Sequence, residues 1–236
     1  MKFAWETLTD SVHRCRLRFL DVTVGLIRGS GGVMVVDTGT TLATAAALAA
    51  DAVALTGFTV THVVLTHHHF DHVMGSSAFS GAAIYSMPDV AAYMATQRQH
   101  MRAHALEYGA DVGEVDAALA ALRPVDHPIR DAEIDLGGRV VSIRHLGRGH
   151  TSADLAVVVP EVPGGPGRTV VFCGDLVEES ADPFIDADSD LAAWPATLDR
   201  LLDAGGDDAI YVPGHGALVD ATFVRRQQAW LRERAG

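Results

Sequence analysis

The chain has 236 residues, 48% of them hydrophobic and 20% charged, which allows a sizeable core in one large or two small domains. Its formal net charge of −12 repels phosphate backbones, so nucleic acid is not expected as a partner. The two cysteines, Cys15 and Cys173, are too few for a disulfide framework, so we expect reduced thiols in a cytoplasmic protein. No segment looks like a signal peptide or a membrane span, so we expect no membrane contact.

The first part of the chain alternates strands with one helix. Residues 14–20, 22–28 and 33–36 are predicted strands, with a turn at 29–32. They end at Asp37-Thr38-Gly39, a junction between strand and helix. Thr40 or Thr41 is a suitable N-cap for the following helix, and Gly57 a suitable stop.

The next predicted strand, Val60 to Leu65, runs into a cluster of potential metal ligands, Thr66-His67-His68-His69-Phe70-Asp71-His72. In an extended segment His67 and His69 project to one side and His68 to the other. Imidazoles and carboxylates are the ligands of a catalytic zinc-type cation, so this loop could serve two neighbouring metals. The alternative is an accidental polar loop, but clustered imidazoles and a carboxylate are costly to bury with nothing to bind.

A short strand at 82–85 precedes a helical stretch, residues 88–123, which we predict as two helices broken near Gly109 and Gly113. Two interpretations stay open for this insert. It is either an ordinary amphipathic pair packed on the sheet or a lid over the metal loop, because methionine and aromatic stripes serve both purposes. The lid interpretation gives His100 and His104 more weight than the remaining histidines without a motif context: His13, His62, His68, His127 and His145.

The last part of the chain returns to strands. We predict strands at 132–136, 139–145, 153–159, 168–173 and 209–212, a turn at 137–138, a Pro/Gly loop at 163–167, and helices at 191–202 (capped by Asp190) and 221–234. Strands and helices come in two similar blocks around the helical insert at about 88–125. We therefore expect one domain, 1–236, of the α+β class: a four-layer αβ/βα sandwich of two sheets with helices on both outer faces.

Three further motifs place a ligand beside glycine at the end of an apolar strand. They are Gly149-His150-Thr151, Gly174-Asp175 and Gly214-His215. Glycine permits tight turns and close backbone approach to an ion. With the loop at 67–72 they complete a set of five histidines and two aspartates, which suits two metals that share one carboxylate.

These residues resemble the metallo-β-lactamase-fold hydrolases, over roughly Asp37 to Gly216 and in the family's order. Asp37-Thr38-Gly39 resembles the first motif and Thr66-His67-x-His69-x-Asp71-His72 the signature; His150, Asp175 and His215 match the third to fifth motifs.

The resemblance implies a ligand assignment for two Zn²⁺ ions, with Fe or Mn as alternatives. His67, His69 and His150 would hold one metal, Asp71, His72 and His215 the other, and Asp175 would bridge them. Asp37 would orient a ligand. Thr66 and Thr151 either do the same or serve as strand-end and turn residues.

Some positions depart from the family's patterns. Arg148 stands where proline is usual, and its guanidinium is either solvated or meets an anionic substrate. Asp175 is similar to glyoxalase II and lactonases and unlike zinc β-lactamases. Only about twenty residues follow Gly216, too few for the substrate domain of glyoxalase II, and Glu178 and Glu179 stand where lactonases have tyrosine. No single subfamily is matched.

The resemblance implies a dinuclear zinc-dependent hydrolase that cleaves an ester, thioester or lactone of a small molecule with a metal-bridged hydroxide, Asp71 exchanging the proton. The alternatives are a phosphodiesterase or β-lactamase of the same fold, a mononuclear iron oxidoreductase like the persulfide dioxygenases, and a non-catalytic binding module. A homodimer stays open. Cys173, near Asp175, is interpreted as a buried apolar residue rather than a nucleophile.

Overall fold

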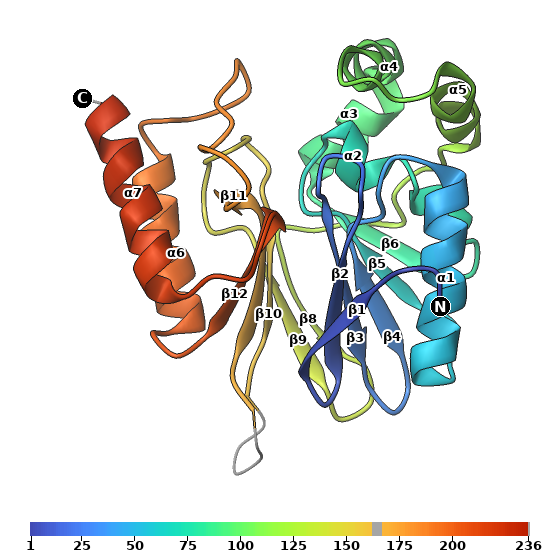
Figure 1. The fold of residues 1–236 in the computed structure, drawn as a ribbon, viewed down its shortest axis with the longest axis horizontal. Coiled ribbons are helices and arrows are strands. Elements are labelled where there is room, and N and C mark those ends of the chain that lie inside the picture. Colours follow the sequence, from blue (N-terminus) through green and yellow to red (C-terminus); the bar gives the residue numbers. More distant parts are fainter. Residues whose placement is uncertain (162–166, 236) are drawn as a thin grey trace.

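The computed structural model describes residues 1–161 and 167–235 and shows two sheets packed face to face with helices outside them (Figure 1). The first sheet has the order β1-β2-β3-β4-β5-β6-β7, antiparallel from β1 to β4 and parallel from β4 to β7. Its strands are β1 (Trp5–Thr9), β2 (Val12–Arg16), β3 (Thr23–Arg28), β4 (Val33–Val36), β5 (His62–Val64), β6 (Ala83–Ser86) and β7 (His127–Pro128).

The second sheet has the order β12-β11-β10-β9-β8, in which only β11 and β12 are parallel. Its strands are β8 (Asp131–Asp135), β9 (Val140–Arg144), β10 (Ala156–Val159), β11 (Val170–Glu178) and β12 (Ile210–His215). The helices are α1 (Leu42–Thr56), α2 (Phe70–Val73), α3 (Pro88–Thr96), α4 (Arg98–Glu107), α5 (Val112–Ala121), α6 (Trp194–Gly205) and α7 (Ala221–Ala235), with a 3₁₀ turn at Ser76–Ala78.

Helices cover both outer faces, as expected for the four-layer sandwich. In Figure 1, α1 lies outside the first sheet and α6 with α7 outside the second, while α3, α4 and α5 lie together at one end of the molecule. In the described part of the chain, no helix combines the length and apolar character needed to cross a bilayer.

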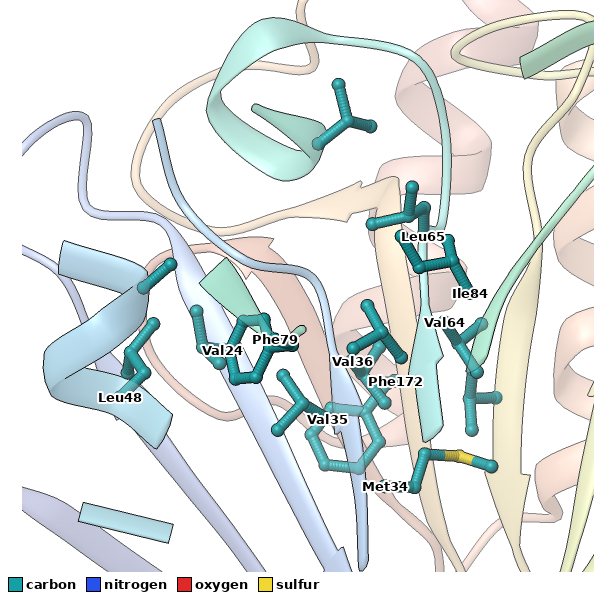
Figure 2. Packing of buried hydrophobic residues seen from close by; sticks show 14 of the residues in the cluster. Val24, Met34, Val35, Val36, Leu48, Val64, Leu65, Phe79, Ile84 and Phe172 are labelled. Carbon is teal, nitrogen blue, oxygen red and sulfur yellow. The ribbon is translucent and has the colours of Figure 1, made fainter. Parts of the chain in front are cut away.

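The main core lies between the two sheets. Phe172 of β11 belongs to the same buried cluster as Val35 and Val36 of β4 (Figure 2). A side chain at Gly25 of β3 would come within 2.5 Å of the Phe172 ring, so glycine there lets the ring pack directly against the opposite sheet.

The predicted first helix is confirmed at both ends. Thr41 is the N-cap, and its side chain accepts a hydrogen bond from the backbone N–H of Thr44. Gly57 adopts φ +79° at the other end and donates its N–H to the carbonyl of Val53. The turns at 29–32 and 137–138 also join antiparallel strands as predicted.

The prediction of two helices at 88–123 was wrong, because the insert contains three. The additional break lies at Gln97, which leaves helical geometry at φ −109° and ψ 27° between α3 and α4. The chain does leave helical structure near Gly109, but Gly113 lies inside α5, whose N-cap Asp111 accepts from the N–H of Glu114. Met94 of α3 and Met101 of α4 are both buried, so the break lets both helices pack on the core.

Several predicted boundaries were also wrong. The strand expected at 168–173 continues past Gly174 to Glu178 because a register shift absorbs the glycine. The final strand likewise reaches His215, and the helix expected from 191 starts at Trp194 because Asp190 and Ala193 form a turn before it. The strands expected at 14–20 and 153–159 are shorter than predicted, and the sequence did not predict β1 and β7. Of the predicted Pro/Gly loop, residues 163–166 lie outside the described residues.

Candidate metal centre

All seven candidate ligands gather at one edge of the two sheets. His67, His69 and His150, called the three-histidine group here, offer ring nitrogens that lie with a carboxylate oxygen of Asp175 within 4.8 Å of one another. The Nε2 of His150 is 2.9 Å from the Nδ1 of His69 and 3.5 Å from the Oδ2 of Asp175. All four side chains are buried, and two of them come from each half of the chain.

Asp71, His72 and His215, called the mixed group here, form a second cluster beside the first. The Nε2 of His215 is 3.4 Å from the Oδ2 of Asp71 and 3.2 Å from the Nε2 of His72. Asp175 lies between the clusters: its Oδ2 is 3.2 Å from His215 Nε2 and 3.5 Å from His67 Nε2. Asp175 therefore lies within 3.5 Å of a histidine from each group.

The loop after β5 separates its histidines as expected. His67 and His69 face Asp175 and His150, whereas His68 points to the other side, where its Nε2 is 3.1 Å from Asp188 and its ring packs on Tyr93. His69 is extended at φ −66° and ψ 145°, and the short helix α2 begins at the next residue. This change of backbone direction brings Asp71 and His72 to the cluster from another side.

Two glycines make room for the Asp175 carboxylate on the adjacent parallel strands. Gly174 adopts φ +51°, and the β11–β12 register shifts on both sides of it. On β12, a Cβ at Gly214 would lie 1.8 Å from Asp175 Oδ1. The glycines therefore let this carboxylate approach both groups.

Asp37 holds the mixed group in place. Its Oδ2 accepts hydrogen bonds from His72 Nδ1 and Thr66 Oγ1, each at 2.8 Å, and its Oδ1 accepts from the Thr66 N–H. Asp37 has φ +62°, a conformation that few non-glycine residues adopt and that tends to be retained at functional sites. Thr38, whose role the sequence reasoning missed, donates both its N–H and its hydroxyl to the carbonyl of His72.

Hydrogen bonds also fix which nitrogen of the other rings faces the cluster. Nδ1 of His150 donates to the carbonyl of Phe184 at 3.2 Å, and Nδ1 of His215 donates to that of Leu20 at 2.6 Å. Nδ1 of His67 is 3.0 Å from Thr66 Oγ1. Each of these rings therefore presents Nε2 to the cluster.

Thr151 does not contact a candidate ligand through its side chain. Its N–H and hydroxyl both donate to the buried carboxylate of Asp154, at 2.9 and 2.8 Å. Burial raises the pKa of Asp154 to about 8. This pair shapes the turn that follows His150.

The residues of the cluster fit a metal ion. Nε2 of His67 and Oδ1 of Asp175 are both buried without a hydrogen-bond partner, and the nearest cationic group to this Oδ1 is His72 Nε2 at 3.3 Å. Buried polar atoms are nearly always paired, and these two belong to the residue types that ligate zinc. A cation would satisfy both atoms, so the donor set is consistent with metal binding.

The two groups differ in protonation. Burial lowers the pKa of His69 and His67 well below the usual value and also lowers that of His150. Burial would also lower the pKa of His215, but the carboxylates of Asp175 and Asp71 together outweigh it and raise that pKa to about 10. The three-histidine group is therefore neutral at pH 7, as ligands must be.

His72 is protonated for the same reason as His215. Burial opposes its charge, but the carboxylates of Asp175, Asp71 and Asp37 raise its pKa well above the usual value. In return His72 and His215 outweigh the burial of Asp175 and hold its pKa well below the usual value. Without metal, protons therefore occupy the mixed group.

A cavity of about 260 Å³ opens beside the cluster and exposes atoms of both groups. Its lining is Leu20, His69, Phe70, Asp71, His104, Tyr108, His150, Asp175, Glu178, Ser180, Ala181, Phe184 and His215. Glu178 was noted in the sequence only as a departure from lactonases; burial, followed by the Asp175 charge, raises its pKa to about 8. Arg148 does not line this cavity, and its Nη1 is 3.3 Å from Asp190 Oδ2.

The helical insert contributes to the cavity and to the core alike. His104 of α4 and Tyr108 after it line the cavity, and the ring of His104 lies 5.3 Å from that of Phe70. His100 instead pairs with the hydroxyl of Tyr93 outside the cavity. Both cysteines are buried and free.

Comparisons with known proteins identify the family and the fold of the chain. A family model described as "Metallo-beta-lactamase superfamily" matches residues 17–215. The metallo-beta-lactamase type 2 of Bacteroides fragilis is 28% identical over 106 residues, a match that covers 43% of this chain and 40% of that protein. The chain therefore matches less than half the length of this curated relative.

Solved structures show the same fold. VMB-1 superimposes with a TM-score of 0.74 at 18% identity, covering 99% of this chain and 98% of the other. The metallo-beta-lactamase FIM-1 of Pseudomonas aeruginosa, in its mono-zinc form, gives 0.73 at 18% identity and covers 100% and 97%. At this identity the likeness establishes the fold alone.

Proposed function

The chain belongs to the metallo-beta-lactamase superfamily, and from this premise we propose that it is a dinuclear zinc-dependent hydrolase of small-molecule esters, thioesters or lactones. The observation that carries the proposal is the pair of ligand groups sharing Asp175, with His67 Nε2 and Asp175 Oδ1 buried and unpaired. His67, His69 and His150 would hold one ion, and Asp71, His72 and His215 the other. Bound zinc would polarise the substrate carbonyl and make a water acidic enough to react at neutral pH.

The protein's own groups would orient the substrate and move the proton. Asp71 lines the cavity, so its carboxylate can exchange a proton with the attacking water or the leaving group. Leu20, Phe70 and Phe184 form apolar walls that exclude bulk water from the substrate. In the described part of the lining no lysine or arginine is present, which favours an uncharged acyl group over an anionic one.

A β-lactamase is the second candidate, favoured by the proteins that the chain resembles in sequence and fold. The lining argues against it, because β-lactam antibiotics carry a carboxylate and the described cavity residues include no lysine or arginine to pair with it. Hydrolysis of a chromogenic cephalosporin, compared with that of a neutral aryl ester and a lactone of similar size, decides between the two.

We also propose that residues 1–236 form one domain in which the insert at about 88–125 acts as a lid. His104 and Tyr108 reach the cavity from this insert, and Tyr108 is 41% exposed at the cavity wall. Tyr108→Ala is expected to raise KM more than it lowers kcat, because the ring would touch the substrate but not the reacting bond. An unchanged KM for every accepted substrate would contradict the lid.

We propose a cytoplasmic location, because both cysteines are buried free thiols and would persist in a reducing compartment. Fractionation of the native host with an antibody against the protein tests this. Recovery outside the cytoplasm would contradict it.

The first test is the metal content of tag-free protein purified without added metal or chelator, followed by a panel of thioesters, lactones, phosphodiesters and cephalosporins. We expect two zinc ions per chain and turnover of a neutral ester or lactone. His69→Ala should abolish that turnover and leave the circular dichroism spectrum unchanged. One iron ion per chain together with oxygen uptake on a persulfide would instead support the dioxygenase alternative.

A further inference from the structure

Glu178 lies beside the mixed group although no sequence motif marks it. It is the last residue of β11 and pairs in register with His215 on the parallel strand β12. The side chain is buried and lines the cavity. Ligand atoms of Glu178, Asp175 and His215 lie within 4.8 Å of one another.

His215 connects this trio to the mixed group through one atom. Because its Nδ1 donates to the carbonyl of Leu20, only Nε2 can bind an ion. That Nε2 also lies 3.4 Å from Asp71 and 3.2 Å from His72. Ligands of one zinc-type ion lie at most about 4.4 Å apart, twice the metal–oxygen distance, so an ion on Nε2 has Glu178 close to its coordination sphere.

The described surroundings of Glu178 provide no lysine or arginine to pair with its carboxylate. One hydrogen bond, from the N–H of Phe184 to Oε2 at 3.3 Å, leaves the other oxygen free to face the cavity. The charged form of a buried carboxylate near Asp71 and Asp175 is costly, and a cation bound at His215 Nε2 would offset that cost.

We propose that Glu178 is an additional ligand of the second metal position, together with Asp71, His72, Asp175 and His215. This inference rests on the proposed dinuclear centre and adds a third carboxylate to it. Carboxylate oxygens suit manganese, imidazoles suit zinc and iron, and sets that mix the two are common for iron. The second position would therefore accept Mn²⁺ or Fe²⁺, while the three-histidine group retains zinc.

The test is a titration of the protein carrying one zinc ion with Mn²⁺, following free Mn²⁺ by electron paramagnetic resonance. Glu178→Gln keeps an acceptor for the Phe184 N–H but loses the charge. Glu178→Asp keeps the charge but withdraws it by one methylene. Glu179→Gln is the matched control, because this neighbour accepts from the Ala217 N–H outside the ligand groups.

We expect the first equivalent of zinc to bind all four proteins equally. Mn²⁺ should bind the wild type and Glu179→Gln alike, and both Glu178 variants about 100-fold more weakly. Cobalt substituted at the second position should show a changed visible spectrum only in the Glu178 variants, because their coordination changes. Should Glu178→Gln not fold, Glu178→Asp alone decides the outcome.

If Glu178→Asp binds Mn²⁺ with wild-type affinity and leaves the cobalt spectrum unchanged, the inference is overturned. The role of Glu178 would then be its negative charge alone or its hydrogen bond with the Phe184 N–H. That result would leave the dinuclear hydrolase intact. If the wild type instead holds no second ion with any metal, the proposed function fails before the Glu178 variants are compared.

Discussion

The three-histidine group and the mixed group lie side by side and share Asp175, yet they differ in charge. Burial keeps the three-histidine group neutral, since it lowers the pKa values of His67, His69 and His150. The carboxylates of the mixed group keep His72 and His215 protonated. One group is ready to bind a metal at neutral pH, and the other must first release protons.

The contrast shows that a shared carboxylate does not make the two proposed metal positions equivalent. Asp175 is close to both groups, but Asp71 and Asp37 add negative charge on one side only. We therefore expect the first ion to enter the three-histidine group and the second to bind with a stronger dependence on pH and on Asp37.

The largest effect is expected when the carboxylate shared by the two groups is removed. Asp175→Asn takes the shared carboxylate from both groups, so both metals should be lost and turnover should fall by about 1,000-fold or more. Metal content by mass spectrometry and the rate with the best ester of the panel measure this. Retention of both ions would show that Asp175 does not bridge.

The difference in protonation predicts different pH dependences for the two ions. At pH 7 the raised pKa values leave His72 and His215 protonated, so the second ion displaces about two protons from these rings and its affinity should rise at least about 100-fold per pH unit through neutrality. The first ion should displace almost none. Calorimetric titration in buffers of different ionisation enthalpy counts the protons, and equal release for both ions would contradict the contrast.

Asp37→Asn should act on one group only. Asparagine tolerates φ +62° but cannot accept all three hydrogen bonds that Asp37 accepts, so the affinity for the second ion should fall about 10- to 100-fold. The first ion should bind as before, measured by competition with a chromogenic chelator. If the affinities for both ions fall by the same factor, Asp37 supports the whole loop at 67–72 rather than the mixed group alone.

The smallest effect is expected from Asp154→Asn, behind the three-histidine group. Above about pH 8 Asp154 is ionised, and the amide would then keep only one of the two hydrogen bonds from Thr151, which should cost about 1–3 kcal/mol of unfolding free energy. Urea unfolding of the metal-free protein measures this. The affinity for the first ion should also fall several-fold. A fall in the affinity for the second ion alone would contradict the assignment of Asp154 to the side of the three-histidine group.

Sequence reasoning reached the architecture and the clustering of the candidate ligands because both depend on local signals. The loop after β5 places four candidate ligands within six residues, and the other three each stand beside a glycine. The third helix of the insert also has a local signal, since Asp111 is a typical N-cap residue and its side chain accepts from the N–H of Glu114 three positions later.

Other features had no local signal. Glu178 acquires its place only through the pairing of β11 with β12, whose register with His215 depends on two irregularities around Gly174. Gln97 is a good helix former, and it ends α3 because the packing of the core on both sides overrides this propensity. These features depend on tertiary contacts between residues far apart in the chain.

The origin of the ligands in both halves of the chain has a consequence for the order of events during biosynthesis. His69 and His150 touch across 81 positions, and His215 ends the last strand of the second sheet. A nascent chain therefore exposes four candidate ligands long before the other three exist, and contacts so distant in sequence form late in folding. We expect metal capture to follow translation of β12, so that ion supply acts on the folded protein rather than on the ribosome-bound chain.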